Sequence, residues 1–402
     1  MSPGSRATEP HNEATGRSTQ ETADGQPIGR GRPTTMRDIA TETGVSRSTV
    51  SRILNDAPLS VPIAAGTRAR VLAAARDRGY RPNPLARALR GAPTMLLGAI
   101  VRDITDPFFA GAIEAVSVEA RKRDYNIVLS HAHAEATEAY VLATMLEARQ
   151  CDAILLLGDM GDQPRLLDDL RDARVPVVAL WQGSELDLIP AVNVDNRSGI
   201  ASAISHLVAL GHRRIAFVGG RLLGDIRERQ AAYAEAMIEL LGDVPPGYVQ
   251  LVSNTPADGE IAFRALMQQS PVPTAVVAST DVLALGVLRG ALVTGVRVPD
   301  QLSVVGFDDI PMASFSVPAL TTVRMPMAEM AAAAIELAIG APRRTDRDRS
   351  GVVEREFDPA DHEHERPNPG NDVPETGRAL VRLFRPELIV RESTHAADPP
   401  GV

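Results

Sequence analysis

The stretch MRDIATETGVSRSTVSRIL, residues Met36–Leu54, has the pattern of two short helices that meet at a glycine. Four apolar side chains are spaced so that they lock the two helices together at a steep angle: Ile39, Val45, Val50 and Ile53. Gly44 supplies the tight turn, because a residue without a Cβ enters the left-handed conformation at little cost. Ser46 is expected to cap the second helix through its hydroxyl. The stretch therefore predicts a helix-turn-helix.

The second helix of this motif presents polar and basic side chains to the outside. Arg47 and Arg52 are credible base readers, because a guanidinium can bond two acceptors of a guanine edge in a major groove. A solvated polar helix face is the alternative for any single residue, but it explains the complete motif poorly. We predict DNA contacts from five residues of this helix: Arg47, Ser48, Thr49, Ser51 and Arg52.

Charge along the chain separates a basic segment from an acidic remainder. The net charge of −9 would by itself argue against a nucleic-acid partner. Residues 30–91, however, hold twelve arginines, no lysine and four acidic residues, a net charge of +8 that leaves −17 for the rest. A small basic module on a larger acidic one is the electrostatic pattern of a DNA-binding head on a body with another task.

After Pro93 the composition changes to short apolar runs separated by amphipathic stretches. The first series of predicted buried strands is Met95–Val101, Ile127–Leu129, Ala153–Leu157 and Val175–Leu180. The second series is Ile215–Val218, Tyr248–Val252, Ala275–Ala278 and Leu302–Phe307. Alternating strands and helices predict a doubly wound α/β fold with parallel sheets. Two series predict two lobes, with a ligand beyond the carboxyl ends of the strands.

Composition also predicts the domain limits. Residues 1–33 are polar and lack periodicity, which predicts a disordered tail. Residues 34–91 are assigned to the DNA-binding domain and residues 92–402 to the two-lobed body. Within the body, the Pro-rich and highly charged residues 343–374 are expected to form a mobile insertion.

Several classes of protein leave no signature in the chain. No apolar run approaches the roughly 20 residues that a membrane span needs, and the N-terminus lacks a secretory signal. The single cysteine, Cys151, rules out an internal disulfide, which fits a reducing compartment. We therefore expect a cytoplasmic protein without a membrane partner.

Signatures of catalysis and of cofactor or metal binding are also missing. There is no Gly-x-Gly-x-x-Gly after a strand, no phosphate-loop lysine, no HExxH and no CxxC. His131 and His133 stand at strand spacing with no further ligand nearby, so polar surface is preferred to a metal site. We expect no enzyme, no cofactor and no metal. Two alternative functions are a sugar-processing enzyme and the sugar-binding protein of a transporter. A transporter's sugar-binding protein would lack a DNA-binding head.

The helix-turn-helix resembles that of the LacI/GalR family of bacterial transcriptional regulators at every motif position from Met36 to Leu54. The likeness covers nearly everything from Thr35 to Ala341 and resumes at Pro386–Thr394. Its later motifs include Gly79-Tyr80, Pro82-Asn83, Ala86-Arg87-x-Leu89, Ile104-x-Asp106-Pro-Phe-Phe109, Gly211-His-Arg-Arg-Ile215 and Val304-Val-Gly-Phe-Asp-Asp309. The resemblance implies an all-α helix-turn-helix head on an α/β two-lobed, periplasmic-binding-protein-like body.

The resemblance further implies a homodimeric repressor whose binding to near-palindromic operator DNA is controlled by a small-molecule effector, a sugar or sugar derivative. A hinge helix at about residues 84–90 would order on DNA and wedge Leu89 into the minor groove. A plain linker with a buried leucine is the alternative. Asn55, Tyr80 and Asn83 are further expected DNA contacts, although the stretch from Asn55 to Thr67 is about three residues longer than usual.

Five residues are predicted to bind the effector: Phe108, Trp181, Arg229, Asp281 and Asp308. Phe108 and Trp181 follow strands, where rings beside carboxylates suit the apolar face and the hydroxyls of a sugar. The other three match family positions, but Thr280 replaces the usual asparagine and Ala232 the usual glycine. Core packing of the rings and helix capping by Asp308 are the alternatives.

Overall fold

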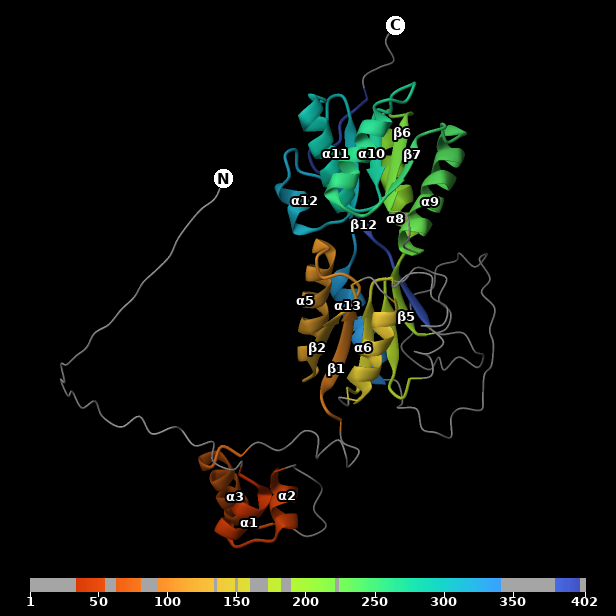
Figure 1. Ribbon diagram of the computed structural model, residues 1–402. Coiled ribbons are helices and arrows are strands. Elements are labelled where there is room, and N and C mark those ends of the chain that lie inside the picture. Colours follow the sequence, from red (N-terminus) through yellow and green to blue (C-terminus); the bar gives the residue numbers. More distant parts are fainter. Residues whose placement is uncertain are drawn as a thin grey trace, which may run out of the picture. The chain divides into compact units, whose positions relative to one another are not determined.

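The computed structural model describes residues 34–54, 63–80, 93–133, 136–148, 151–159, 173–181, 189–220, 224–340 and 380–397. The chain divides into two compact units, Met1–Asn83 and Pro84–Val402, and each is described by itself (Figure 1). The predicted tail, the hinge segment at residues 84–90 and the insertion at residues 343–374 lie outside the described residues.

The described residues of the first unit form three helices, α1 (Met36–Thr43), α2 (Arg47–Leu54) and α3 (Ala65–Asp77). Thr35 and Asp38 form a capping box at the start of α1, which satisfies free backbone N–H groups. Gly44 ends α1 with a φ of 69°, and the Thr49 N–H donates to the Ser46 hydroxyl at 3.1 Å. The predicted helix-turn-helix is confirmed, including its glycine turn and its serine cap.

The core of this head draws on all three helices. Ile39 from α1, Val50 from α2 and Val71 from α3 are fully buried and pack in one cluster. Because so small a domain has few other apolar contacts, this cluster as a whole supplies most of its hydrophobic stabilisation.

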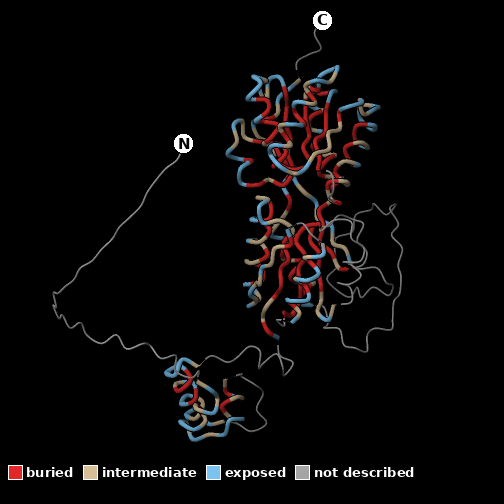
Figure 2. Tube along the Cα trace, viewed as in Figure 1, coloured by how far each residue is buried: buried red, intermediate tan, exposed pale blue. Residues whose placement is uncertain are grey.

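The first lobe of the body is built on a six-stranded sheet in the order β11-β5-β4-β3-β1-β2, in which every pair is parallel. Its strands are β1 (Leu96–Val101), β2 (Asn126–His131), β3 (Ala153–Leu157), β4 (Val177–Leu180), β5 (Ala191–Val194) and β11 (Val381–Phe384). Its described helices are α5 (Pro107–Arg121), α6 (Ala136–Ala148) and α13 (Met327–Gly340). Every residue of β3 is buried, as expected for a strand covered on both faces. Figure 2 shows buried residues gathered in the interior of the body.

The second lobe repeats this plan with the strand order β12-β10-β9-β8-β6-β7, and only β12 runs antiparallel to its neighbour. Its strands are β6 (Ile215–Gly220), β7 (Val249–Val252), β8 (Ala275–Ala278), β9 (Ser303–Asp308), β10 (Thr321–Arg324) and β12 (Glu387–Ile389). Its helices are α8 (Asn196–Ala209), α9 (Gly224–Leu241), α10 (Pro256–Leu266), α11 (Asp281–Thr294) and α12 (Pro311–Phe315). The expected two-lobed parallel α/β body is confirmed.

The chain passes between the lobes three times in the described residues: from β5 to α8, from β10 to α13, and from β11 to β12 (Figure 1). Each lobe is therefore assembled from separate stretches of sequence. The carboxyl ends of β1, β3 and β4 meet those of β7, β8 and β9 around one pocket. This arrangement positions the candidate site.

Candidate effector pocket and DNA-binding surface

A pocket lies where the strand ends of the two lobes meet. It combines aromatic, acidic and basic side chains, a mixture typical of sites for small polar ligands. The lining residues are Arg102, Asp106, Phe108, Phe109, Gly158, Asp159, Trp181, Asp225, Ile226, Arg229, Asn254, Thr280 and Asp308.

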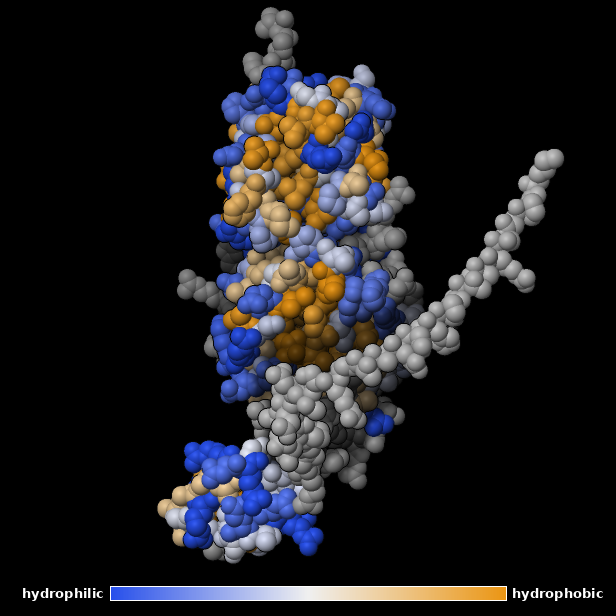
Figure 3. Space-filling model, turned by 60° about the vertical axis from the view of Figure 1, so that its left-hand side comes forward, coloured by the Kyte–Doolittle hydropathy of each residue, from blue (hydrophilic) through white to orange (hydrophobic). Residues whose placement is uncertain are grey.

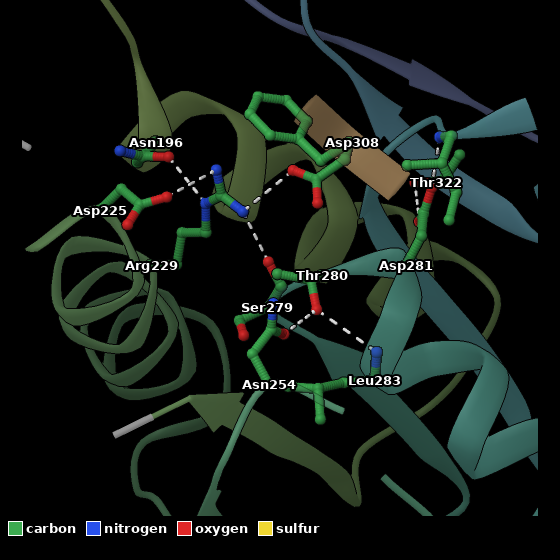
Figure 4. Close-up of polar contacts among 12 residues, drawn as sticks. Asn196, Asp225, Arg229, Asn254, Ser279, Thr280, Asp281, Leu283, Asp308 and Thr322 are labelled. Atoms are coloured by element: carbon green, nitrogen blue, oxygen red, sulfur yellow. Dashed lines mark hydrogen bonds and ion pairs between the residues drawn. The ribbon is translucent and has the colours of Figure 1, made fainter. Parts of the chain in front are cut away.

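Arg229 of α9 is the centre of the polar network, and only 2% of it is exposed (Figure 4). Its Nε donates to Asn196 Oδ1 at 2.8 Å, and its Nη1 donates to the Ser279 carbonyl at 2.6 Å and to Asp308 Oδ1 at 3.3 Å. Its Nη2 lies 3.4 Å from Asp225 Oδ2. The guanidinium also stacks 3.6 Å from the centre of the Phe307 ring. Arg229 is thus held in place before any ligand arrives.

Asp308 ends β9 with a φ of 115°, a backbone conformation that residues other than glycine rarely adopt. Burial raises the pKa of its carboxyl well above the usual value, and the nearby Arg229 guanidinium opposes that rise. The helix-capping alternative does not describe it, because α12 begins after Ile310 without a side-chain cap. Asp308 instead faces Arg229 in the pocket (Figure 4).

Two polar chains connect the lobes across the pocket. Thr280 Oγ1 donates to Asn254 Oδ1 at 2.7 Å, and Asn254 Nδ2 donates to Asp106 Oδ2 at 3.1 Å. Separately, the Gly224 N–H of the second lobe donates to the Asp159 carboxylate of the first. A ligand bound between the lobes would therefore change these contacts.

Three aromatic rings form the apolar side of the pocket. The Phe108 ring packs edge-on against Phe109 at 5.1 Å and against Trp181 at 5.2 Å between centres. Trp181 is 3% exposed and has a positive φ of 57°. Tyr233, by contrast, lies in the core against Phe217, where its hydroxyl donates to the Ile215 carbonyl at 2.9 Å.

The predicted DNA-contacting residues of the head lie on and beside α2. Arg47, Ser48 and Arg52 are exposed, whereas Thr49 and Ser51 are half-buried. Tyr80 packs at the edge of the head core. The remaining predicted contacts, Asn55, Asn83 and Leu89, lie outside the described residues.

Comparisons with known proteins agree with both units. Residues 35–83 match the model of bacterial regulatory proteins of the lacI family, and residues 204–357 match a periplasmic binding protein-like domain. Catabolite control protein A of Priestia megaterium is 32% identical over 306 residues, which are 75% of this chain and 91% of that protein. The chain belongs to the LacI family of bacterial regulatory proteins. It is a DNA-binding transcriptional regulator, as its relatives are.

Solved structures show the same fold as this LacI-family regulator. A lac repressor dimer bound to operator and the anti-inducer ONPF matches with a TM-score of 0.73 and 23% identity, covering 91% of this chain and all of that one. A complex of the transcriptional regulator CelR with cellobiose matches with a TM-score of 0.60 and 28% identity, covering 90% of this chain and 99% of that one.

For this LacI-family chain, the structure brings four of the five predicted effector residues together and leaves one out. Phe108, Trp181, Arg229 and Asp308 all line the pocket. Asp281 does not, because its buried carboxylate accepts the Ile310 N–H at 2.8 Å and the Thr322 hydroxyl at 2.5 Å (Figure 4). It ties the strand β10 to the segment that follows β9.

Sequence reasoning missed five polar lining residues: Arg102, Asp106, Asp159, Asp225 and Asn254. Four of them stand one to five residues beyond the carboxyl end of a strand, which is the signal that would have found them. Asp225 instead lies in the first turn of α9, one helical turn before Arg229.

In the described residues, no helix is long and apolar enough to cross a membrane. That part of the chain also has no group of three or more side chains arranged to hold a metal ion. The rings of His131 and His133 lie 3.9 Å apart between centres and are tilted by 40°, and His133 Nδ1 pairs with Glu138 at 2.9 Å.

We expect Asp281 to make the body less stable as the pH rises from about 4 to about 7. Burial raises its pKa from 3.8 to about 7, so in this range the folded protein binds a proton that the unfolded chain releases. The free energy of unfolding of the native protein, minus that of Asp281→Asn, should fall across this window and stay level above it. Urea denaturation at pH 5, 6, 7 and 8 measures this difference.

Two histidines with lowered pKa values change the pH profile of each protein but not the difference between the two proteins. Burial lowers the pKa of His206 and His212, and the resulting slope has the opposite sign and is common to both proteins. Parallel pH profiles for the native protein and the variant would contradict the prediction.

Proposed function

We propose that this chain is a homodimeric cytoplasmic repressor that binds a near-palindromic operator and whose operator affinity is controlled by a sugar or sugar derivative. The pocket carries the proposal, because aromatic rings and buried charged groups converge there between two lobes. Its position suits an effector, since a ligand that changes the contacts between the lobes changes the state of the whole body.

The chemistry of the pocket supports a sugar. Phe108 and Trp181 offer ring surface to the C–H face of a pyranose. Asp308 and Asp225 offer carboxylate oxygens to hydroxyl donors, while Arg229 offers N–H groups to hydroxyl oxygens. The similarity to a regulator in complex with cellobiose agrees with this assignment.

Exposed apolar side chains around α12 support a dimer. Phe315 and Val317 are 85% and 91% exposed, and Met312 is also exposed. The view in Figure 3 brings the side of the body with α5 and α12 forward, and apolar surface gathers there on both lobes. Contiguous apolar surface of this kind is typical of a protein–protein interface. A two-fold dimer would place two heads on two half-sites of one operator.

The DNA-binding surface in this proposal is the outer face of α2. The helix presents Arg47, Ser48 and Arg52 to solvent, as a helix that enters a major groove must. The glycine turn after Thr43 and the Ser46 cap fix where α2 begins.

The test measures the operator affinity of the full chain with and without sugars, using DNA selected from a random duplex pool. A sugar that binds the pocket should change the operator affinity about 5- to 150-fold, the usual range of such coupling, and operator should change sugar affinity by the same factor. Arg52→Ala should cost about 1–3 kcal/mol of discrimination at one operator position if Arg52 reads a base. It should leave sugar binding unchanged.

Two results would contradict the proposal. One is operator affinity that no sugar alters although a sugar binds. The other is a monomer at micromolar concentration both free and on DNA, as determined by sedimentation.

A further inference from the structure

Three helices begin at the pocket, and at each of them one backbone N–H already donates to a side chain of the protein itself. The N-terminus of a helix is the ready-made binding site for phosphate, because its free N–H groups and dipole favour negative charge. At α5, Asp106 Oδ1 accepts the Phe108 N–H at 3.0 Å. At α11, Thr280 Oγ1 accepts the Leu283 N–H at 3.3 Å. At α9, the Asp159 carboxylate accepts the Gly224 N–H.

The two arginines of the described lining, Arg102 and Arg229, are also paired with carboxylates. Arg102 Nη2 lies 3.4 Å from Asp106 Oδ2, and Arg229 is paired with both Asp225 and Asp308. The described lining has four carboxyl groups against these two guanidinium groups. An anionic group placed here must compete with carboxylates for both guanidinium groups, whereas a hydroxyl can donate to the carboxylates.

One donor in the pocket is left without a partner. The indole N–H of Trp181 is buried and makes no hydrogen bond within the described part of the chain. Buried donors are almost always paired in native proteins, so an unpaired donor in a ligand pocket indicates an acceptor that arrives with the ligand. Trp181 is held for this task by the edge-on contact with Phe108.

We propose that the pocket selects an uncharged sugar over its phosphorylated form, and that the Trp181 indole donates a hydrogen bond to an oxygen of that sugar. This inference rests on the proposed function, since it narrows the class of the effector. Asp225 is the residue that enforces the selection most directly, because it competes with any anion for Arg229.

The protonation of the pocket agrees with this selection. Burial raises the pKa of Asp106, and nearby Asp103 and Asp225 raise it further, while Arg102 opposes the rise. Buried Asp308 has a raised pKa as well, with Asp106 and Asp225 among the causes. The burial and the neighbouring carboxyl groups that disfavour the ionised forms of Asp106 and Asp308 would also disfavour another negative charge in the pocket.

The first experiment uses the native full chain and its own fluorescence. Trp181 is the chain's single tryptophan, so its emission reports on the pocket. Glucose, galactose, maltose and cellobiose are titrated beside the 6-phosphate of each. At least one neutral sugar should change the emission and bind at least tenfold more tightly than its phosphate. A phosphate that binds equally well or better overturns the inference but leaves the sugar proposal standing. If none of the eight compounds changes the Trp181 emission, the result contradicts the proposed function itself.

The second experiment separates the donor from the ring. Trp181→Phe keeps an aromatic ring and removes the N–H, and should weaken binding of the neutral sugar about threefold to tenfold by calorimetry. Circular dichroism checks that the variant is folded. Unchanged affinity in the folded variant would overturn the role of the indole.

The third experiment tests the charge. Asp225→Asn should narrow the ratio between neutral and phosphorylated sugar at least threefold, because Arg229 is then freer to meet a phosphate. Glu239→Gln is the matched control, since it removes one negative charge from an exposed position on the same helix. The ratio should stay at its native value in the control. An unchanged ratio in Asp225→Asn would overturn selection by charge.

Discussion

Arg229→Ala is expected to destabilise the body by about 3–5 kcal/mol, the usual cost of removing one partner of a buried ion pair. The substitution leaves the buried Asp308 carboxyl without its cation and opens the contacts to Asn196 and to the Ser279 carbonyl. It also removes the stacking partner of Phe307. Urea denaturation of the full chain, followed by circular dichroism, measures the loss. Sugar binding should be lost along with it.

A second substitution distinguishes the buried charge from simple loss of packing. If the unpaired, buried Asp308 carboxyl causes most of the loss of stability, the double variant Arg229→Ala/Asp308→Asn should be more stable than Arg229→Ala alone. Equal stability of the single and the double variant would show that the ion pair contributes little beyond packing.

Ile39→Ala is expected to unfold the head while the body remains folded. Ile39 is fully buried between α1 and the other two helices, and such truncations cost about 2–5 kcal/mol. A domain of this size has a total stability of only a few kcal/mol, so most heads would be unfolded. Operator affinity should fall at least tenfold. Sugar binding should be unchanged, because the head and the body are separate compact units.

Thr41→Ala is the matched control for this prediction. Thr41 lies on the same helix, is exposed, and its hydroxyl only donates to the Arg37 carbonyl of its own helix. The control should bind operator like the native protein. Loss of sugar binding in Ile39→Ala would instead show that the stability of the body depends on the head.

The parts of the fold that could be predicted are those fixed by local sequence. Gly44 and Ser46 determine the turn and the start of α2 through their own backbone and side-chain chemistry. The run Ala153–Leu157 is apolar throughout, so its burial as β3 was evident. The strands β5 and β10 were not predicted, because polar residues such as Asn193 and Thr322 interrupt their apolar runs.

The site was predictable in its location and less so in its detail. Strand ends identified Trp181 and Asp308 because ligands in parallel α/β folds lie there. Asp281 also stands at a strand end, yet its carboxylate turns to Thr322, which is 41 residues later in the chain. Only tertiary packing decides between two such directions. The pairing of Arg229 with residues of three other elements depends on packing in the same way.

The pairing of β11 with β5 and of β12 with β10 determines when this protein can finish folding during synthesis. Both strands come from residues 381–389, so both sheets lack an edge strand until residue 389 has been translated. The head is synthesised before the body, because its three described helices all lie within Thr34–Tyr80. The head can therefore fold while the body is still being made. Neither lobe can be completed before residues 381–389 have been made. A ribosome that stops before residue 381 therefore releases a chain with neither lobe complete.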